Sequence, residues 1–341
     1  PPFDYYTKEY EKGLQLYSKG VLIMDKCAEL LPDYFSFVKG LVDSEDLSLN
    51  ISRETLQHDG QLKLIAKPLE KKIKSELEKM LKDEREAYEE FFKAFGIQLK
   101  FGIYNDYGAH KETLRDLLIF RSSNEKKYVT LKEYVSRMKE GQDSIYYACG
   151  ETDEKIDMLP QTDAVKDKGF EILYLTENVD EFAIKMLAEY DGKKFVNICD
   201  NDLNLDSEDE KKALEEENTA AKDMFEAMKE SLGDKINAVR FTNKLKDHPV
   251  CLTSEGGISL EMEKVLNSMP GAEQNKVKAQ LVLEINANHP IAEKLKALYT
   301  EDKDTLGKYA KLLYGEACLI GGKSVPDPAE HSALVCELMT K

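Results

Sequence analysis

The 341-residue sequence lacks a surplus of positive charge and lacks any long apolar run. Its 48 Lys and Arg residues are outnumbered by 65 Asp and Glu residues, which gives a formal net charge of −17. Because phosphate contacts need clustered Lys and Arg, this balance argues against a general nucleic-acid binder or a binder of anionic membranes. No apolar run approaches the ~20 residues of a membrane-spanning helix. We therefore expect a cytoplasmic protein that binds neither nucleic acid nor membrane.

Cysteine and histidine are present, but not with the spacing of disulfide, metal or catalytic sites. The cysteines form no C-x-x-C pair, which fits reduced thiols in a cytosol better than a disulfide framework. The histidines show no ligand spacing, so we expect no metal site. No G-x-S-x-G motif or Cys/His constellation suggests covalent catalysis. The cysteines occupy positions 27, 149, 199, 251, 318 and 336, and the histidines positions 58, 110, 248, 289 and 331.

The start of the chain also lacks the elements of a complete domain. The sequence begins at Pro1 without Met and shows no signal peptide. Apolar stretches at 13–17 and 20–25 predict two strands, and a short helical segment precedes Pro32. Two strands with so few neighbours cannot bury both faces of a sheet. We expect residues 1–52 to be the end of a larger α/β subdomain, and the chain to be a fragment.

Helical periodicity dominates residues 53–143. Apolar residues at three- and four-residue spacing predict two long helices. Pro68 lies inside the first pattern and should kink or split that helix, and Gly96 should end the second. Thr130 and Glu133 have the spacing of a capping box, which predicts the start of another helix. We interpret the apolar face of each helix as core. These faces consist of Leu62, Ile65, Leu69 and Ile73 in the first helix and of Tyr88, Phe91, Phe92 and Phe95 in the second.

Strands and helices alternate in residues 144–205. This pattern predicts a small three-layer α/β/α unit with a parallel sheet and right-handed crossovers. The segment Gly150–Asp153 after the first strand is no G-x-G-x-x-G loop, so a structural role is favoured over a nucleotide site. The strands are predicted at 144–149, 170–175 and 194–199, and the helices near 151–158 and 180–190.

An acidic stretch at 203–217 predicts a junction, and a second domain of α+β type follows over 206–341. Its first helix should bury Met224, Phe225, Met228 and Leu232. The strands are predicted near 238–242, 250–253 and 280–285, and the later helices near 258–268, 290–299, 304–320 and 327–339. The fold class is thus α/β (mixed α+β): a partial α/β layer, a helical segment, a small parallel sheet, and an α+β domain ending in helices.

Two features of the last helices have a chemical or assembly interpretation. Ala317–Ser324 is one residue short of the phosphate-binding G-x-x-x-x-G-K-S, but it closes a helix rather than opening one. We therefore interpret Gly321 and Gly322 as a helix C-cap. The terminal helices carry more apolar surface than one small domain can cover, which predicts a symmetric bundle with a second copy.

Two motifs resemble a single family. Residues 37–57 read F-V-K-G-L-V-D-S-E-D-L-S-L-N-I-S-R-E-T-L-Q. This run closely resembles the middle-domain signature of the heat-shock protein 90 chaperones, with Ser48 in place of the usual Pro. Residues 282–290 resemble the family's L-E-I-N-P-x-H-P, with Ala287 where Pro is usual. The resemblance covers nearly the whole chain and implies a middle domain over 1–205 and a C-terminal dimerisation domain over 206–341.

The resemblance nominates Arg53 and Gln57 as catalytic residues. In the family, the arginine reaches the γ-phosphate of ATP, bound with Mg in an N-terminal domain that this sequence does not contain. Arg53 follows the N-cap residues Asn50 and Ser52, and Gln57 lies four residues on. From the residues alone, a cation at a helix N-terminus is either solvated or held ready for an anion. The fragment by itself should be inactive as an ATPase.

The resemblance also nominates binding surfaces. Glu181 and Phe182 would present an exposed acid and aromatic to client proteins, although bacterial members can carry Trp at the second position. The helix near 258–268 hangs from Gly256 and Gly257; core packing is its default role, and a Met-bearing client surface is the alternative. The expected client residues are Glu181, Phe182, Ile258, Met262, Val265 and Leu266, and the expected dimer residues are Leu306, Tyr309, Leu313, Leu334 and Leu338.

The implied function is that of a bacterial-type, ATP-dependent, homodimeric chaperone of the stress response. Its partners would be unfolded or partly folded clients and bacterial co-chaperones. The chain lacks the M-E-E-V-D tail of eukaryotic cytosolic members, so co-chaperones that dock on that tail are not expected. Two other classes stay open: a nucleotide-binding enzyme that uses the sheet at 144–199, and a non-catalytic helical scaffold.

Overall fold

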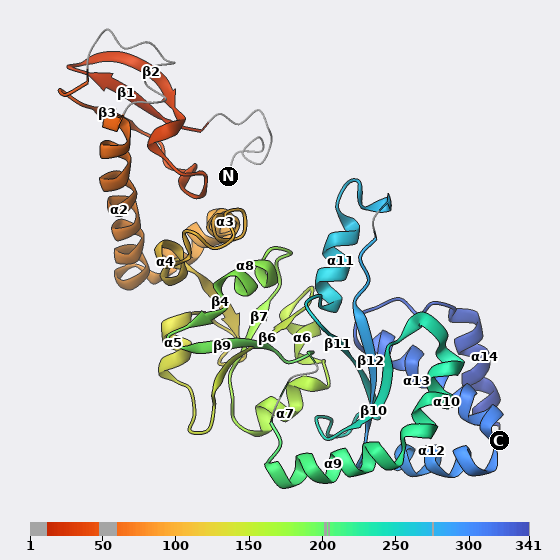
Figure 1. Cartoon of the computed structure of the whole chain (residues 1–341). Coiled ribbons are helices and arrows are strands. Elements are labelled where there is room, and N and C mark those ends of the chain that lie inside the picture. The colour runs from red at the N-terminus through yellow and green to blue at the C-terminus, as the bar shows by residue number, and fades with distance from the viewer. Residues whose placement is uncertain (1–11, 48–59, 201–202, 204, 275, 341) are drawn as a thin grey trace. The chain divides into compact units, whose positions relative to one another are not determined.

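The computed structural model describes residues 12–47, 60–200, 203, 205–274 and 276–340 (Figure 1). The chain divides into two compact units. Unit 1 comprises residues 1–120, 128–136 and 179–190, and unit 2 comprises residues 121–127, 137–178 and 191–341. The chain therefore enters each unit more than once, and we describe each unit by itself.

Unit 1 opens with a three-stranded sheet of β1 (Leu14–Ser18), β2 (Val21–Cys27) and β3 (Leu41–Asp43), in the order β2-β1-β3. The first two strands were predicted and are antiparallel, whereas the short β3 was not predicted and pairs parallel with β1. Two 3₁₀ turns, Ala28–Leu30 and Asp33–Phe35, connect β2 to β3. Apolar side chains on β2 and β3 are exposed, so the sheet is only partly covered.

The long helix α2 (Gly60–Asp83) runs unbroken past Pro68, so the expected split is wrong. Proline has no N–H, and the carbonyl that loses its donor is that of Leu64, four residues earlier. Leu64 is 73% exposed, so water can take the place of the missing donor. The proline therefore costs one hydrogen bond and does not end the helix.

The next helix, α3 (Arg85–Tyr104), continues through Gly96, so the predicted end at this glycine is also wrong. Gly96 is buried against an aromatic ring: an added Cβ would lie 2.7 Å from Cδ1 of Phe92. Gly102, in the same helix, leaves similar room for Tyr34. These glycines serve close packing, and the helix ends at Asn105 instead.

The rest of unit 1 packs around α3. The predicted capping box is confirmed, because the Glu133 N–H donates to Oγ1 of Thr130 (3.0 Å) and the Thr130 N–H donates to the Glu133 carboxylate (2.7 Å). Arg85 on α3 also pairs with Glu133 at 3.1 Å. The remaining elements are α4 (Lys111–Leu114), a 3₁₀ turn at Arg115–Leu117, β5 (Tyr128–Thr130), α5 (Leu131–Ser136), α8 (Asp180–Leu187) and β8 (Glu189–Tyr190).

Unit 2 begins with the parallel sheet that the sequence predicted. Strand β6 (Ser144–Cys149) lies between β7 (Ile172–Leu175) and β9 (Lys193–Asn197) and is parallel to both. The end of β4 (Ile119–Ser122) pairs antiparallel with β7, which was not predicted. Two short helices follow β6, α6 (Asp153–Asp157) and α7 (Gln161–Asp167); only the first was predicted.

The remainder of unit 2 is an α+β domain, also as predicted. Its sheet has the order β10-β12-β11, with β10 parallel and β11 antiparallel to β12. Helices α10 and α13 pack on this sheet (Figure 1), and the predicted Met224, Phe225, Met228 and Leu232 are all buried. The elements are α9 (Glu208–Ala220), α10 (Lys222–Leu232), β10 (Ala238–Thr242), β11 (Val250–Glu255), α11 (Leu260–Ser268), β12 (Gln280–Asn286), α12 (Pro290–Glu301), α13 (Lys303–Ile320) and α14 (Pro328–Met339), with 3₁₀ turns at Gly233–Lys235 and Ala272–Gln274.

The near-match to a phosphate loop is a helix end, as expected. The Gly321 N–H donates to the Ala317 carbonyl, and the Lys323 N–H donates to the Cys318 carbonyl (2.8 Å). Gly322 has a φ of +68°, the left-handed conformation that closes such a cap. These bonds satisfy the last carbonyls of α13.

Candidate functional sites

Arg53 and Gln57 lie outside the described residues. The chain that leads toward them is anchored to the sheet of unit 1. The Ser44 N–H donates to the Tyr17 carbonyl (3.0 Å), and the Ser18 hydroxyl donates to the carbonyl of Leu47 (2.6 Å). Leu47 is itself buried. The segment before the predicted catalytic loop is therefore fixed to β1 as far as residue 47.

The expectation that Glu181 and Phe182 are exposed is wrong, because both are buried at the start of α8. Neighbouring Asp180 forms an ion pair with Lys100 of α3 at 2.5 Å, and both side chains are less than 5% exposed. The Lys100 ammonium also lies 5.3 Å from the ring centroids of Phe92 and Phe120. A buried ion pair of this kind holds α8 against α3.

Phe182 packs edge-on against Tyr104, with ring centroids 5.3 Å apart. A phenylalanine ring is smaller than an indole and has no N–H to satisfy, so it can be buried completely. Glu181 is buried beside it, and its carboxylate lies 3.8 Å from Nζ of Lys185. In this conformation α8 presents neither side chain to solvent.

The amphipathic helix α11 is neither core nor fully exposed. None of its nine described residues is fully buried, and Met262, Val265 and Leu266 are half-buried. Ile258 and Leu260, at its base, pack against the core of the α+β domain. The helix thus keeps its base in the core and leaves the rest of its apolar face partly open to solvent.

Polar contacts fix the position of α11. Its N-cap is Ser259, whose hydroxyl oxygen accepts from the Met262 N–H (3.1 Å), and Gly256 before it has a φ of +83°. Asn267 exchanges two hydrogen bonds with the backbone of Val277 (2.8 and 2.9 Å). Lys264 reaches across to Glu151 at 2.8 Å. These contacts tie both ends of the helix to neighbouring segments.

Three of the five expected dimer residues are buried within the chain itself. Leu306 and Leu313 belong to the core of the α+β domain, and Leu334 of α14 is buried too. The domain covers more of its terminal helices than the sequence suggested, because α13 packs on both α10 and β11. Tyr309 and Leu338 remain half-buried. The large apolar residues left exposed on these helices include Leu319 (55%) and Met339 (81%).

Helix α14 is held to α13 by ion pairs that run along their length. Lys308 pairs with Glu337 and Lys311 with Glu330, each at 2.6 Å. His331 lies against Gly315, where a Cβ would come within 2.3 Å of the imidazole ring. The close approach allowed by this glycine places α14 directly on α13.

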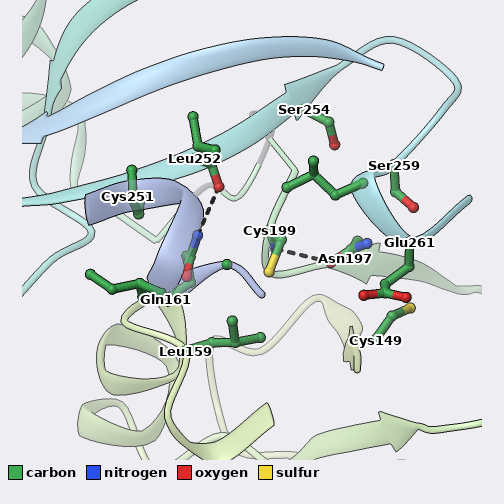
Figure 2. Close-up of a pocket in the computed structure, with 14 residues that line it drawn as sticks. Cys149, Leu159, Gln161, Asn197, Cys199, Cys251, Leu252, Ser254, Ser259 and Glu261 are labelled. Atoms are coloured by element: carbon green, nitrogen blue, oxygen red, sulfur yellow. Dashed lines mark hydrogen bonds between the residues drawn. The ribbon is translucent and has the colours of Figure 1, made fainter. Parts of the chain in front are cut away.

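A cavity lies between the parallel sheet and the α+β domain within unit 2 (Figure 2). It holds about 40 Å³ that water-sized molecules can reach. Its walls are formed by the ends of β6, β9 and α13, by β11, and by the starts of α7 and α11. Three of the six cysteines, Cys149, Cys199 and Cys251, line it. The sequence pattern gave no sign of this convergence, except that Cys149 ends β6 and Cys199 follows β9, two parallel strands whose carboxyl ends share one edge.

The polar groups of this cavity include one protonated thiol and several hydrogen-bond acceptors. Burial and the nearby Glu284 carboxylate raise the pKa of Cys251 well above its usual range, so its thiol stays protonated. The Cys199 N–H donates to Oδ1 of Asn197 (2.9 Å), and Nε2 of Gln161 donates to the Leu252 carbonyl (3.1 Å). Among the described residues, no three His, Cys, Asp or Glu side chains are placed to hold a metal ion.

No helix in the described part of the chain is long and apolar enough to cross a membrane.

Comparison with known proteins gives one consistent result. Residues 1–341 match the family model described as Hsp90 protein. The chain is 59% identical over 338 residues to proteins named "Chaperone protein HtpG" from Bacillus subtilis, Clostridium perfringens and Halalkalibacterium halodurans. Each alignment covers 99% of this chain and 54% of the relative. The chain therefore spans about half the length of these relatives.

Proposed function

Because this chain belongs to the Hsp90 family, we propose that it is the middle and C-terminal part of an ATP-dependent, homodimeric molecular chaperone of the bacterial type. The observation that carries the proposal is the match over the whole chain, at 59% identity to relatives named as chaperones. In this proposal residues 1–205 belong to the middle domain and residues 206–341 to the dimerisation domain. ATP and Mg would be bound by a further domain of the full-length protein.

In this proposal Arg53 completes the ATPase site, with Gln57 beside it. A guanidinium suits the task because it forks onto phosphate oxygens and stays charged at any working pH. The main contribution of such a guanidinium is to stabilise the negative charge that develops on the γ-phosphate in the transition state. The hydrogen bonds that hold the chain to β1 as far as Leu47 support this proposal, because the segment that leads to Arg53 starts from a fixed position.

We propose that clients bind on α11, through Ile258, Met262, Val265 and Leu266. The support is its partly open apolar face, since unpaired apolar surface with a flexible methionine suits varied partners. Ile258 also packs in the core, so it contributes to both roles. Glu181 and Phe182 are buried here, and they would meet a client only after α8 has moved away from α3.

The test is suppression of client aggregation by the full-length protein carrying Met262→Ser and Leu266→Ser. We expect clearly weaker suppression, with an unchanged melting temperature, because both side chains are only half-buried. Met158→Ser is the matched control, since Met158 is 71% exposed and lies outside α11. If the double variant suppresses client aggregation fully, α11 does not bind clients. If the double variant does not fold, Met262 and Leu266 belong to the core.

A nucleotide-binding enzyme built on the parallel sheet is the weaker alternative. In such sheets the ligand binds beyond the carboxyl ends of the strands, and that is where the cavity lies. Among the described residues that line it there is no Lys, Arg or His, while Glu261 is present. A site with a carboxylate and no cation opposes phosphate binding.

A further inference from the structure

The sheet of the α+β domain has two edge strands, and the protein covers them in different ways. In the order β10-β12-β11, the edges are β10 and β11. The edge of β11 is paired by backbone, since the Ser254 N–H donates to the Cys199 carbonyl (3.3 Å) and Asp200 forms a parallel bridge with Ser254. In the described part of the chain, no strand pairs with the outer edge of β10. An edge of this kind presents backbone groups that another chain can pair with.

The register of β10 shows which of its backbone groups face outward. Strand β10 is parallel to β12, and the Thr242 carbonyl accepts from the N–H of Ala287, just beyond β12 (3.0 Å). Successive residues of a strand turn their backbone groups to opposite sides. Thr242 and Arg240 therefore face β12, whereas Phe241 and Val239 direct their N–H and C=O groups to the outer edge.

A single side chain takes the place of a partner strand at Phe241. The Phe241 N–H donates to Oδ1 of Asn218 (2.8 Å), and Nδ2 of Asn218 donates to the Phe241 carbonyl (3.2 Å). A residue of an antiparallel partner strand makes the same two bonds to the residue opposite. None of the described residues makes the matching pair of bonds to Val239. Asn218 thus covers only part of the edge.

Asn218 belongs to α9, which is attached to the domain by a narrow stripe. None of its residues is buried, and only Lys211, Leu214 and Asn218 are half-buried. Leu214 packs against the margin of the core. Lys296 of α12 pairs with Glu217 at 3.3 Å, a partly exposed ion pair that contributes little to stability. Helix α9 can therefore move away from β10 without exposing a buried face.

A groove of about 470 Å³ lies against residues 239–242 of β10. Its lining includes Phe225 and Phe241, which pack together on the side of α10, with ring centroids 4.9 Å apart. It also includes Arg240 and Glu284, which pair at 2.9 Å on the opposite face of the sheet. The groove therefore extends around the edge of β10. Charged side chains of both signs line it, so backbone pairing is a better basis for recognition than ligand charge.

We propose that this groove binds an extended segment of an unfolded client, which adds a strand to the edge of β10. The client backbone replaces Asn218 at Phe241 and also pairs with Val239, so it makes bonds that the side chain does not supply. The inference rests on the proposed chaperone function. Because every polypeptide has the same backbone groups, such a site accepts clients of varied sequence.

Calorimetry of the full-length protein with the capped peptide acetyl-Thr-Val-Thr-Val-Thr-amide tests strand addition. We expect saturable binding. The same peptide N-methylated at every residue keeps its side chains but has lost these backbone donors, and it should bind at least about tenfold more weakly. Equal binding of the two peptides, or no saturable binding of the unmethylated one, would overturn the proposal.

Asn218→Ala tests whether the side chain competes with the peptide. The unmethylated peptide should bind about fivefold more tightly to this variant, because Phe241 then has no internal partner to displace. Asn267→Ala is the matched control, since Asn267 makes the same pair of bonds to the backbone of Val277 outside the groove, and it should leave the affinity unchanged. Unchanged or weaker binding by Asn218→Ala would contradict the displacement.

Hydrogen exchange locates the peptide without any variant. At saturating peptide, exchange of the Val239 and Phe241 amides should slow by at least about fivefold, because both N–H groups become part of a ladder. The amides of α11 should exchange as before. Protection confined to α11 would place the peptide on that helix and contradict the assignment to β10.

The outcomes separate this inference from the proposed function. If the full-length protein suppresses client aggregation but the peptide does not protect β10, strand addition is wrong and the chaperone proposal stands. If the peptide protects Val239 and Phe241 but the protein suppresses no aggregation, the chaperone proposal is wrong and the occupant of the groove is not a client.

Discussion

Asp157, at the end of α6, shows how one carboxylate can organise a surface of the parallel sheet. It pairs with Lys126 (2.6 Å) and Lys166 (2.9 Å) and accepts from the hydroxyl of Tyr174. Partial burial raises its pKa, but the bonds from Lys126, Tyr174 and Lys166 outweigh that effect and lower it to about 2. The charged form is therefore favoured in the folded state.

The pH dependence of stability follows from the sign of this shift. Since the pKa is lower in the folded than in the unfolded state, the stabilisation is complete above about pH 4 and is lost as the pH falls toward 2. Asp157→Asn should cost about 1 kcal/mol at pH 7, discounted for solvent screening, and much less at pH 2, where the folded-state carboxyl is partly protonated. Urea unfolding at several pH values measures this. An equal cost at pH 7 and pH 2 would contradict the account.

At the scale of residues, the role of a glycine was predictable only where it depends on the neighbouring backbone. Gly321 and Gly322 were correctly interpreted as a helix end, because the cap is formed by neighbouring backbone. Gly96 was misjudged because its reason is the ring of Phe92 packed against it, and spacing alone does not show that. Gln161 and Cys251 could not be found from the sequence, since their approach to Cys149 and Cys199 brings together segments that are distant in the chain.

At the scale of elements, the contact between α3 and α8 depends on the buried pair of Lys100 and Asp180. Lys100→Met should destabilise this contact by about 3–5 kcal/mol, because it leaves a buried carboxylate uncompensated. Hydrogen exchange of the α8 amides should speed up accordingly. Combining Lys100→Met with Asp180→Leu should restore much of the protection. Unchanged exchange in the single variant would show that the pair does not hold α8.

Most elements were predictable because their signals are local. The capping box at Thr130 and Glu133, the parallel strands β6, β7 and β9, and the buried face of α10 were all confirmed. The split predicted as one outcome at Pro68 is absent, because the effect of a proline depends on whether water reaches one carbonyl. Strand β3 is three residues long, too short for any periodicity to reveal.

At the scale of the whole molecule, we propose that the exposed end of α14 contributes to the dimer. Met339 is 81% exposed and Leu338 half-buried, whereas Leu306 and Leu313 serve the core. Leu338→Glu with Met339→Glu should therefore convert dimers to monomers in sedimentation without unfolding the domain. Met158→Glu, a charge placed at an exposed methionine elsewhere, should leave the dimer intact. Persistent dimers in the double variant would move the interface away from α14.

The sequence motifs indicated the family, and the match over residues 1–341 agrees with them. Exposure was the weakest part of the prediction: Glu181, Phe182, Leu306, Leu313 and Leu334 were assigned to surfaces and are buried. Whether an apolar or acidic residue faces solvent is decided by which elements pack over it. Periodicity within one element predicts a buried face, as it did for α10, but does not show whether further residues of that element are covered as well.

The most direct test of the proposed function is the ATP turnover of the full-length protein carrying Arg53→Ala. If Arg53 stabilises charge on the γ-phosphate, turnover should fall by roughly 100-fold or more, while ATP binding and dimerisation persist. Arg53→Lys should recover only part of the rate, because an ammonium cannot fork onto two oxygens. Turnover close to that of the unmodified protein in Arg53→Ala would contradict the account and remove Arg53 from the mechanism.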